Sequence, residues 1–106
     1  MDDETRAILA KAKGIVARGW VQNQLGEPGG PRCLVGAILE AEGGTYKITT
    51  EAGRRSLMLI WESLGDDPVA FNNTLGRTQA DVVAVFDKVL AANPAPAPVE
   101  SPVGVA

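Results

Sequence analysis

The chain of 106 residues contains no histidine and a single cysteine. Without histidine, the Ser-His-Asp triads of most hydrolases, Cys-His nucleophile pairs and imidazole metal sites are excluded. With one cysteine, neither an intramolecular disulfide nor a structural zinc site can form. The sequence also lacks the G-x-x-x-x-G-K-S/T phosphate loop and the G-x-G-x-x-G dinucleotide fingerprint. These absences favour a protein that is not an enzyme and that carries no cofactor or metal.

Basic residues are few and dispersed. Ten Lys and Arg stand against thirteen Asp and Glu, which gives a net charge of −3, and the pI is about 4.8. A nucleic-acid-binding protein normally needs a basic face to neutralise phosphates, so we expect no such partner. The start MDDETRAIL is unlike a secretion signal, and no apolar run approaches the roughly 18 residues that span a bilayer. We therefore expect a cytoplasmic protein without a membrane contact.

Apolar periodicity predicts an all-α fold of about four helices. The expected helices cover residues 3–18, 32–41, 51–64 and 78–92, with one short extra turn at 68–71. The segment TYKIT (45–49) could be a brief strand, but a lone strand is marginal, so we interpret it as an extended connector. From residue 93 onward the chain reads NPAPAPVESPVGVA, in which alternating prolines oppose regular structure. The predicted organisation is a helical domain at 1–92 and a disordered Pro/Ala-rich tail at 93–106.

Glycine and proline predict several helix boundaries. Gly19 suits the left-handed position that ends the first helix, with Trp20 folding back on its last turn. Pro31 suits the first turn of the second helix. Gly36 lies in the middle of that helix, where it costs about 1 kcal/mol relative to alanine, so another element is expected to pack closely there.

The later helices begin with polar caps. Thr49 or Thr50 is the expected N-cap of the third helix. An Asp cap with Pro68 at the first position suits the short turn that follows. Thr78, with Asp81 three residues later, forms a capping-box-like start for the last helix.

Four short motifs occur in a fixed order along the chain: Gly19-Trp20, Arg32-Cys33-Leu34-Val35-Gly36-Ala37-Ile38, Phe71-Asn72-Asn73 and Gly76-Arg77-Thr78-Gln79-Ala80-Asp81-Val82. In this order, over roughly residues 7 to 92, the chain resembles a small uncharacterised family of actinobacterial and actinobacteriophage proteins described as a domain of unknown function. That family more often has Trp-Asn-Asp where this chain has Phe71-Asn72-Asn73, which argues against a catalytic carboxylate at position 73. The resemblance implies an actinobacterial or phage source, with the host cytoplasm as location for a phage protein, and implies no activity.

Three groups of residues could carry chemistry, and each also has a structural interpretation. Cys33, beside Arg32 at a helix start, could be a reactive thiol, although its apolar neighbours favour simple burial. The oxygens of Asp66, Asp67, Asn72 and Asn73 could bind Mg²⁺ or Ca²⁺, although Asp and Asn are equally common in turns and helix caps. An anion site could form if four arginines converged: Arg32, Arg54, Arg55 and Arg77.

The aromatic residues divide into core and surface candidates. Trp61 and Phe86 fall on the apolar stripes and are expected in the core, with Ser56 and Glu62 off the stripe. Trp20, beside the glycine-rich loop, is the candidate surface anchor.

We therefore interpret the chain as a small helical binding protein, plausible as a phage accessory protein, whose partner is a host protein or a second copy of the chain. The predicted partner-binding residues are Trp20, Arg32, Arg54, Arg55, Asn72, Asn73 and Arg77. The alternative is a small-molecule or nucleotide-binding protein or enzyme that uses the Arg and Asp/Asn side chains.

Overall fold

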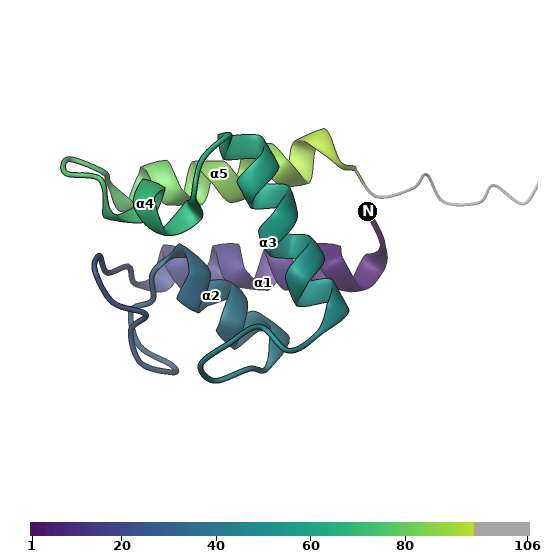
Figure 1. Ribbon diagram of the computed structural model, residues 1–106, viewed down its shortest axis with the longest axis horizontal. Coiled ribbons are helices and arrows are strands. Elements are labelled where there is room, and N and C mark those ends of the chain that lie inside the picture. Colours follow the sequence, from purple (N-terminus) through teal and green to yellow (C-terminus); the bar gives the residue numbers. More distant parts are fainter. Residues whose placement is uncertain (95–106) are drawn as a thin grey trace, which may run out of the picture.

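Every regular element in the computed structural model, which describes residues 1–94, is a helix. The elements are α1 (Asp3–Arg18), α2 (Leu34–Glu42), α3 (Glu51–Leu64), α4 (Pro68–Asn73) and α5 (Gln79–Ala92). Helices α1 and α5 lie side by side in opposite directions, and α3 crosses both (Figure 1). The all-α prediction is confirmed. The predicted tail lies outside the described residues from position 95 onward, so the domain boundary stays a prediction.

One apolar core joins α1, α2, α3 and α5. Helix α1 supplies the periodic stripe that its sequence predicts, with Leu9, Ala12 and Val16 fully buried. Phe86 of α5 is also fully buried, as expected. Each large side chain removed from water in this way contributes roughly 1.5 to 3 kcal/mol. Within residues 1–94, no helix is both long and apolar enough to span a bilayer.

Side-chain caps fix where the later helices begin. Thr50, rather than Thr49, caps α3 by accepting a hydrogen bond from the Gly53 N–H. Asp67 caps α4 with Pro68 at its first position. Thr78 and Asp81 form a complete capping box at α5. The predicted turn and capping box are confirmed.

Two predicted features around the glycine-rich loop are wrong. Gly19 has φ −176° and ψ 141°, which is extended rather than left-handed backbone. Helix α2 begins at Leu34 and not in the turn of Pro31. The reason is long-range backbone pairing, because the N–H of Arg32 donates to the Gly19 carbonyl and the N–H of Cys33 donates to the Leu25 carbonyl. The backbone is extended through the residues that make these bonds, and Cys33, the last of them, is the N-cap of α2.

Gly36 confirms the expected close approach. A Cβ at this position would collide with the Leu25 carbonyl of the glycine-rich loop. The absence of a side chain therefore lets α2 pack directly against loop backbone.

The inner face of α3 is rotated relative to the predicted stripe. Ser56, expected off the stripe, is fully buried, whereas Trp61, expected in the core, is 48% exposed. The Ser56 hydroxyl donates to the Ala52 carbonyl one turn earlier, so its burial leaves no unsatisfied donor. Small residues at 52, 53 and 56, followed by the fully buried Ile60, form the inner side, and the largest side chain of the helix points outward.

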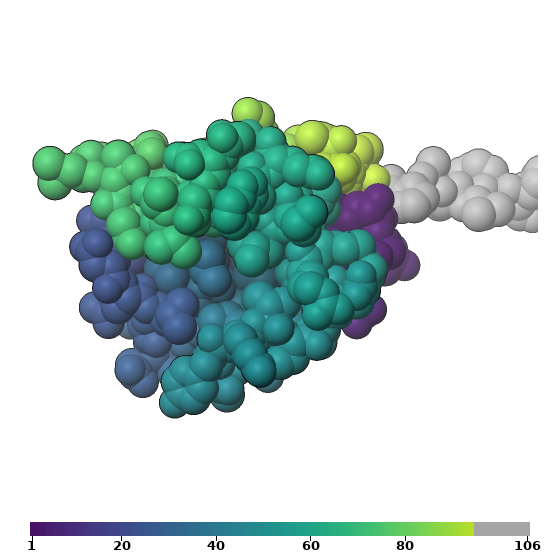
Figure 2. Space-filling view, in the orientation of Figure 1, coloured from purple at the N-terminus to yellow at the C-terminus, as the bar shows by residue number. Residues whose placement is uncertain are grey.

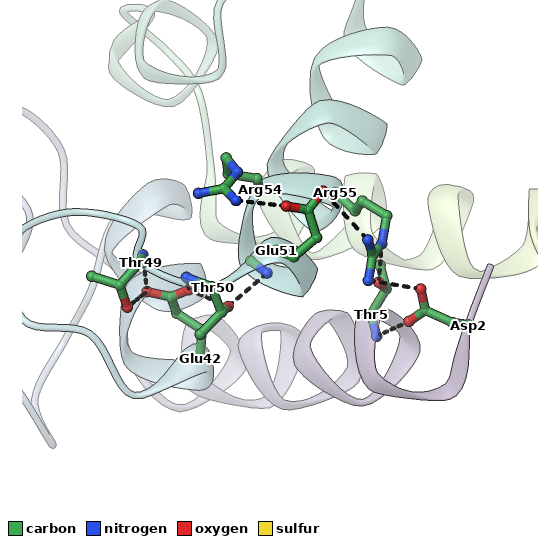
Figure 3. A network of polar contacts seen from close by, with 9 residues as sticks. Asp2, Thr5, Glu42, Thr49, Thr50, Glu51, Arg54 and Arg55 are labelled. Carbon is green, nitrogen blue, oxygen red and sulfur yellow. Dashed lines mark hydrogen bonds and ion pairs between the residues drawn. The ribbon is translucent and has the colours of Figure 1, made fainter.

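Glu42, at the end of α2, holds the start of α3 (Figure 3). Its two carboxylate oxygens accept hydrogen bonds from the backbone N–H and hydroxyl groups of Thr49 and Thr50, at 2.6 to 3.2 Å. Partial burial raises the pKa of Glu42, but the hydrogen bonds from Thr50 and Thr49 outweigh it and hold the pKa below its ordinary value. The Gly53 Cα lies so close to this carboxylate that a Cβ would collide with it.

Replacing Glu42 with Gln should destabilise the fold at neutral pH and not at low pH. Because the folded-state pKa is lowered, the carboxylate stabilises the protein above its unfolded pKa near 4.5 and loses that contribution as the pH falls through the folded value. We expect Glu42→Gln to lower the free energy of unfolding by about 1 to 2 kcal/mol at pH 7, with the difference shrinking towards pH 3. Urea unfolding at several pH values measures this. Glu27→Gln, at an exposed position, is the control, and parallel pH profiles for Glu42→Gln and wild type would refute the assignment.

Candidate functional site

The side-chain amide of Asn72 lies at the meeting point of three of the motifs. Asn72 is 1% exposed. Its Oδ1 accepts hydrogen bonds from the Trp20 indole Nε1 at 2.7 Å and from the Leu34 backbone N at 3.0 Å. Its Nδ2 donates to the Val21 carbonyl at 3.1 Å and to Asn73 Oδ1 at 3.0 Å. All four hydrogen-bonding positions of the amide are therefore used inside the protein.

Asn73 extends this network as an acceptor. Its Oδ1 also accepts from the Asn23 backbone N–H at 2.7 Å, where Asn23 has a positive φ of 65°. Gln22 donates from Nε2 to the carbonyls of Asn72 and Thr74. A carboxylate oxygen at position 73 would accept the same two hydrogen bonds, so the position needs an acceptor and not an amide.

Arg32 is buried inside the glycine-rich loop, with 2% of its surface exposed. Its guanidinium donates to the Gly36 carbonyl at 2.8 and 3.1 Å and to the Gly26 carbonyl at 3.3 Å. Glu40 Oε1 lies 3.6 Å from its Nε. A buried guanidinium requires such partners, and here they tie the loop to α2.

Arg77 packs on α4. Its guanidinium carbon lies 3.7 Å from the centroid of the Phe71 ring, and its Nε donates to the Phe71 carbonyl at 2.9 Å. This is a cation–π contact combined with a backbone hydrogen bond. A tryptophan ring at position 71 would provide the same kind of contact.

The candidate anion and metal sites do not assemble. Arg32 lies in the loop and Arg77 on Phe71, while Arg54 and Arg55 pair with carboxylates of α3 and the N-terminus. Asp66 and Asp67 accept backbone hydrogen bonds of their own turn, and the oxygens of Asn72 and Asn73 are used as described above. No group of three or more acidic or thiol side chains suited to a metal occurs within residues 1–94.

Cys33 is buried and acts as a cap. It is 7% exposed, and its Sγ accepts a hydrogen bond from the Gly36 N–H at 3.2 Å. Burial is the outcome that its apolar neighbours favoured.

The outer side of α3 carries a different arrangement, which we call the α3 face: Glu51, Arg54, Arg55, Met58, Trp61 and Glu62. Met58 is 59% and Trp61 48% exposed. The side chains of α3 form much of the molecular face seen in Figure 2, where the helix is teal. Apolar periodicity alone does not predict that Met58 and Trp61 are exposed. The small residues at 52, 53 and 56 are the sequence signal that their own side of α3 packs inward.

Ion pairs occupy the N-terminal end of the α3 face (Figure 3). Arg54 contacts Glu51 at 2.6 Å, and Arg55 contacts Asp2 at 3.0 Å and Glu51 at 3.5 Å. The pKa of Asp2 is lowered mainly by the hydrogen bond from the Thr5 N–H, with Arg55 adding to it, and that of Glu51 is lowered by Arg54. A hollow of about 500 Å³ opens between the α3 face and the N-terminal residues, and every residue of the face except Trp61 lines it.

Comparison with known proteins places this geometry in a family. A family model described as "Family of unknown function (DUF6197)" matches residues 1–92. The chain belongs to this family. No curated protein and no solved structure matches it.

The DUF6197 match contains both candidate regions, the Asn72 network and the α3 face. It ends at residue 92, which is also the last residue of α5. All of the predicted partner-binding residues lie inside it. Five of them, Trp20, Arg32, Asn72, Asn73 and Arg77, contact other parts of the same chain, and only Arg54 and Arg55 belong to the α3 face.

Two neighbouring Asn→Asp substitutions should have opposite outcomes. Asn72→Asp places an oxygen where Nδ2 donates to two acceptors, so a buried carboxylate faces two other oxygens, and we expect a loss of about 3 kcal/mol or more of unfolding free energy. Asn73→Asp keeps an acceptor for both of its donors, and we expect a change within about 0.5 kcal/mol. Chemical denaturation measures both. Equal destabilisation by the two substitutions would contradict the roles assigned to these residues.

Proposed function

We propose that this DUF6197 member is a non-enzymatic binding protein that works by contact with another protein through the α3 face. The observation that carries the proposal is the exposure of Met58 and Trp61, 59% and 48%, in the middle of a well-anchored helix. Tryptophan is the residue type most enriched at interface hot spots, and methionine adapts its shape to varied partners. Their exposure brings no benefit to the isolated fold.

The charges of the α3 face define the partner's chemistry. Arg54 and Arg55 lie on the N-terminal side of Met58, and Glu62 lies on the C-terminal side. A complementary protein segment is a helix with an apolar centre, an acidic residue facing the arginines and a basic residue facing Glu62.

The finer proposal is a phage accessory protein that engages a host protein in the host cytoplasm. The support for it is the resemblance of the four motifs to actinobacterial and actinophage proteins. In this proposal Arg54 and Arg55 contact the partner, while Trp20, Arg32, Asn72, Asn73 and Arg77 act indirectly, by holding the scaffold that presents α3.

The hollow beside α3 favours a second candidate function, the binding of a small molecule. The charged groups that line it are balanced, because Arg54, Arg55 and the amino terminus of Met1 stand against Asp2, Glu51 and Glu62. The lining therefore gives no preference between anionic and cationic ligands. A thermal-shift screen of nucleotides, metals and neutral metabolites tests this candidate, and uniformly flat responses would dismiss it.

A photo-crosslinking side chain placed at position 58 should capture the partner. We expect the Met58 probe to form a discrete adduct in an actinobacterial lysate, and Trp61→Ala to remove that adduct. The captured protein, once purified, should bind wild-type chain with a Kd that Trp61→Ala weakens about tenfold or more.

The control is the same probe at Lys11, an exposed position on α1. Identical adducts at positions 58 and 11, or an adduct that Trp61→Ala leaves unchanged, would refute the proposal that the α3 face contacts a partner.

A further inference from the structure

We propose that the α3 face binds the α3 face of a second copy of this chain, in an antiparallel, two-fold symmetric dimer. The inference rests on the proposed function, because it names the partner of that same surface. It is argued from the order of charges and aromatic groups along α3.

The α3 face has two edges on either side of Met58. With 3.6 residues per turn, residues seven positions apart lie on the same edge of a helix. Arg55 and Glu62 therefore share one edge, and Arg54 and Trp61 share the other. Each edge thus carries an arginine at its N-terminal end and a complementary group, a carboxylate or an indole ring, at its C-terminal end.

An antiparallel two-fold axis at Met58 brings complementary ends together. It places Arg55 opposite Glu62 of the partner subunit and Arg54 opposite Trp61 of the partner subunit. Because the dimer is symmetric, each contact occurs twice, so the free-energy preference of one contact for the antiparallel arrangement is doubled. A parallel arrangement would instead set arginine against arginine, so the charge order selects the antiparallel one.

The groups involved are free to make these contacts. Glu62 takes part in none of the ion pairs found among residues 1–94. The pairs of Arg54 with Glu51 and of Arg55 with Asp2 are exposed, with side-chain exposures between 44% and 66%, and such surface pairs exchange partners at little cost. The contact of Arg77 with Phe71 shows the geometry that Arg54 would adopt over a tryptophan ring.

The dimer should be of the weak, reversible class. One face of a 14-residue helix supplies a small interface, with Met58 at its centre. Small interfaces of this kind are typical of transient contacts.

Sedimentation equilibrium on the purified chain and its charge-reversal variants tests the inference. We expect a wild-type monomer–dimer equilibrium, and a Kd about tenfold weaker for Arg55→Glu and for Glu62→Arg, because each sets like charges opposite one another twice. An equimolar mixture of the two variants should restore wild-type dimer affinity in the mixed species, since both of its contacts between positions 55 and 62 then pair Glu with Arg. Lys11→Glu is the control for an unrelated charge reversal and should leave the equilibrium unchanged.

Met58→Glu provides a variant that leaves both Arg55 and Asp2 unsubstituted. It sets two carboxylates together at the two-fold axis and should abolish the dimer while circular dichroism and thermal unfolding stay those of the monomer fold. A monomeric wild type at millimolar concentration, or a mixture no more dimeric than its separate variants, would overturn the inference.

The outcome is separable from that of the proposed function. If the wild type is monomeric but the position 58 probe still captures a lysate protein in a Trp61-dependent way, the self-association fails and the binding function stands. If the purified chain dimerises and no other protein is captured, the second copy is the partner. Failure of both experiments would reject the α3 face altogether.

Discussion

The arrangement of the loop, α2 and α4 depends on the side-chain amide of Asn72. Its four hydrogen bonds join Trp20, Val21 and Leu34 to the helix that carries Asn72 and Asn73. These partners are far apart in the sequence, so their bonds fix the path of a loop that glycine and proline leave undetermined. An amide is suited to this role because it donates and accepts at once, while a carboxylate or an alkyl group of similar size does only one or neither.

The sequence motifs that resemble those of a family are, in this structure, mainly architectural. Tryptophan, asparagine and arginine are the residue types of binding sites, but they are also the types that a polar interior needs when a loop packs against helices. Arg32 illustrates this, because its guanidinium satisfies the carbonyls of Gly26 and Gly36. Only burial and hydrogen-bond partners distinguish the two uses, and neither can be read from residue type.

Local features were predictable and long-range ones were not. The bounds of α1, the Thr50 and Asp67 caps and the capping box of α5 follow from patterns within a few residues. The start of α2 does not, because the N–H groups before it pair with carbonyls of the preceding loop. Of the α3 face, sequence reasoning identified the adjacent arginines as candidates and did not single out Met58. It assigned Trp61 to the core, because apolar periodicity places large apolar residues there whenever the spacing allows it.

Helix α3 reverses the usual distribution of side-chain size. Along its first two turns the inner side is built from Ala52, Gly53 and Ser56, which lets Thr5 of α1 and the Glu42 carboxylate approach closely. This close packing excludes Trp61 from the interior and leaves the outer side with no part in holding the core together. A surface that the fold does not need is free to change without loss of stability. The proposed contact uses this surface, because Met58 and Trp61 are exposed there between an arginine pair and a carboxylate.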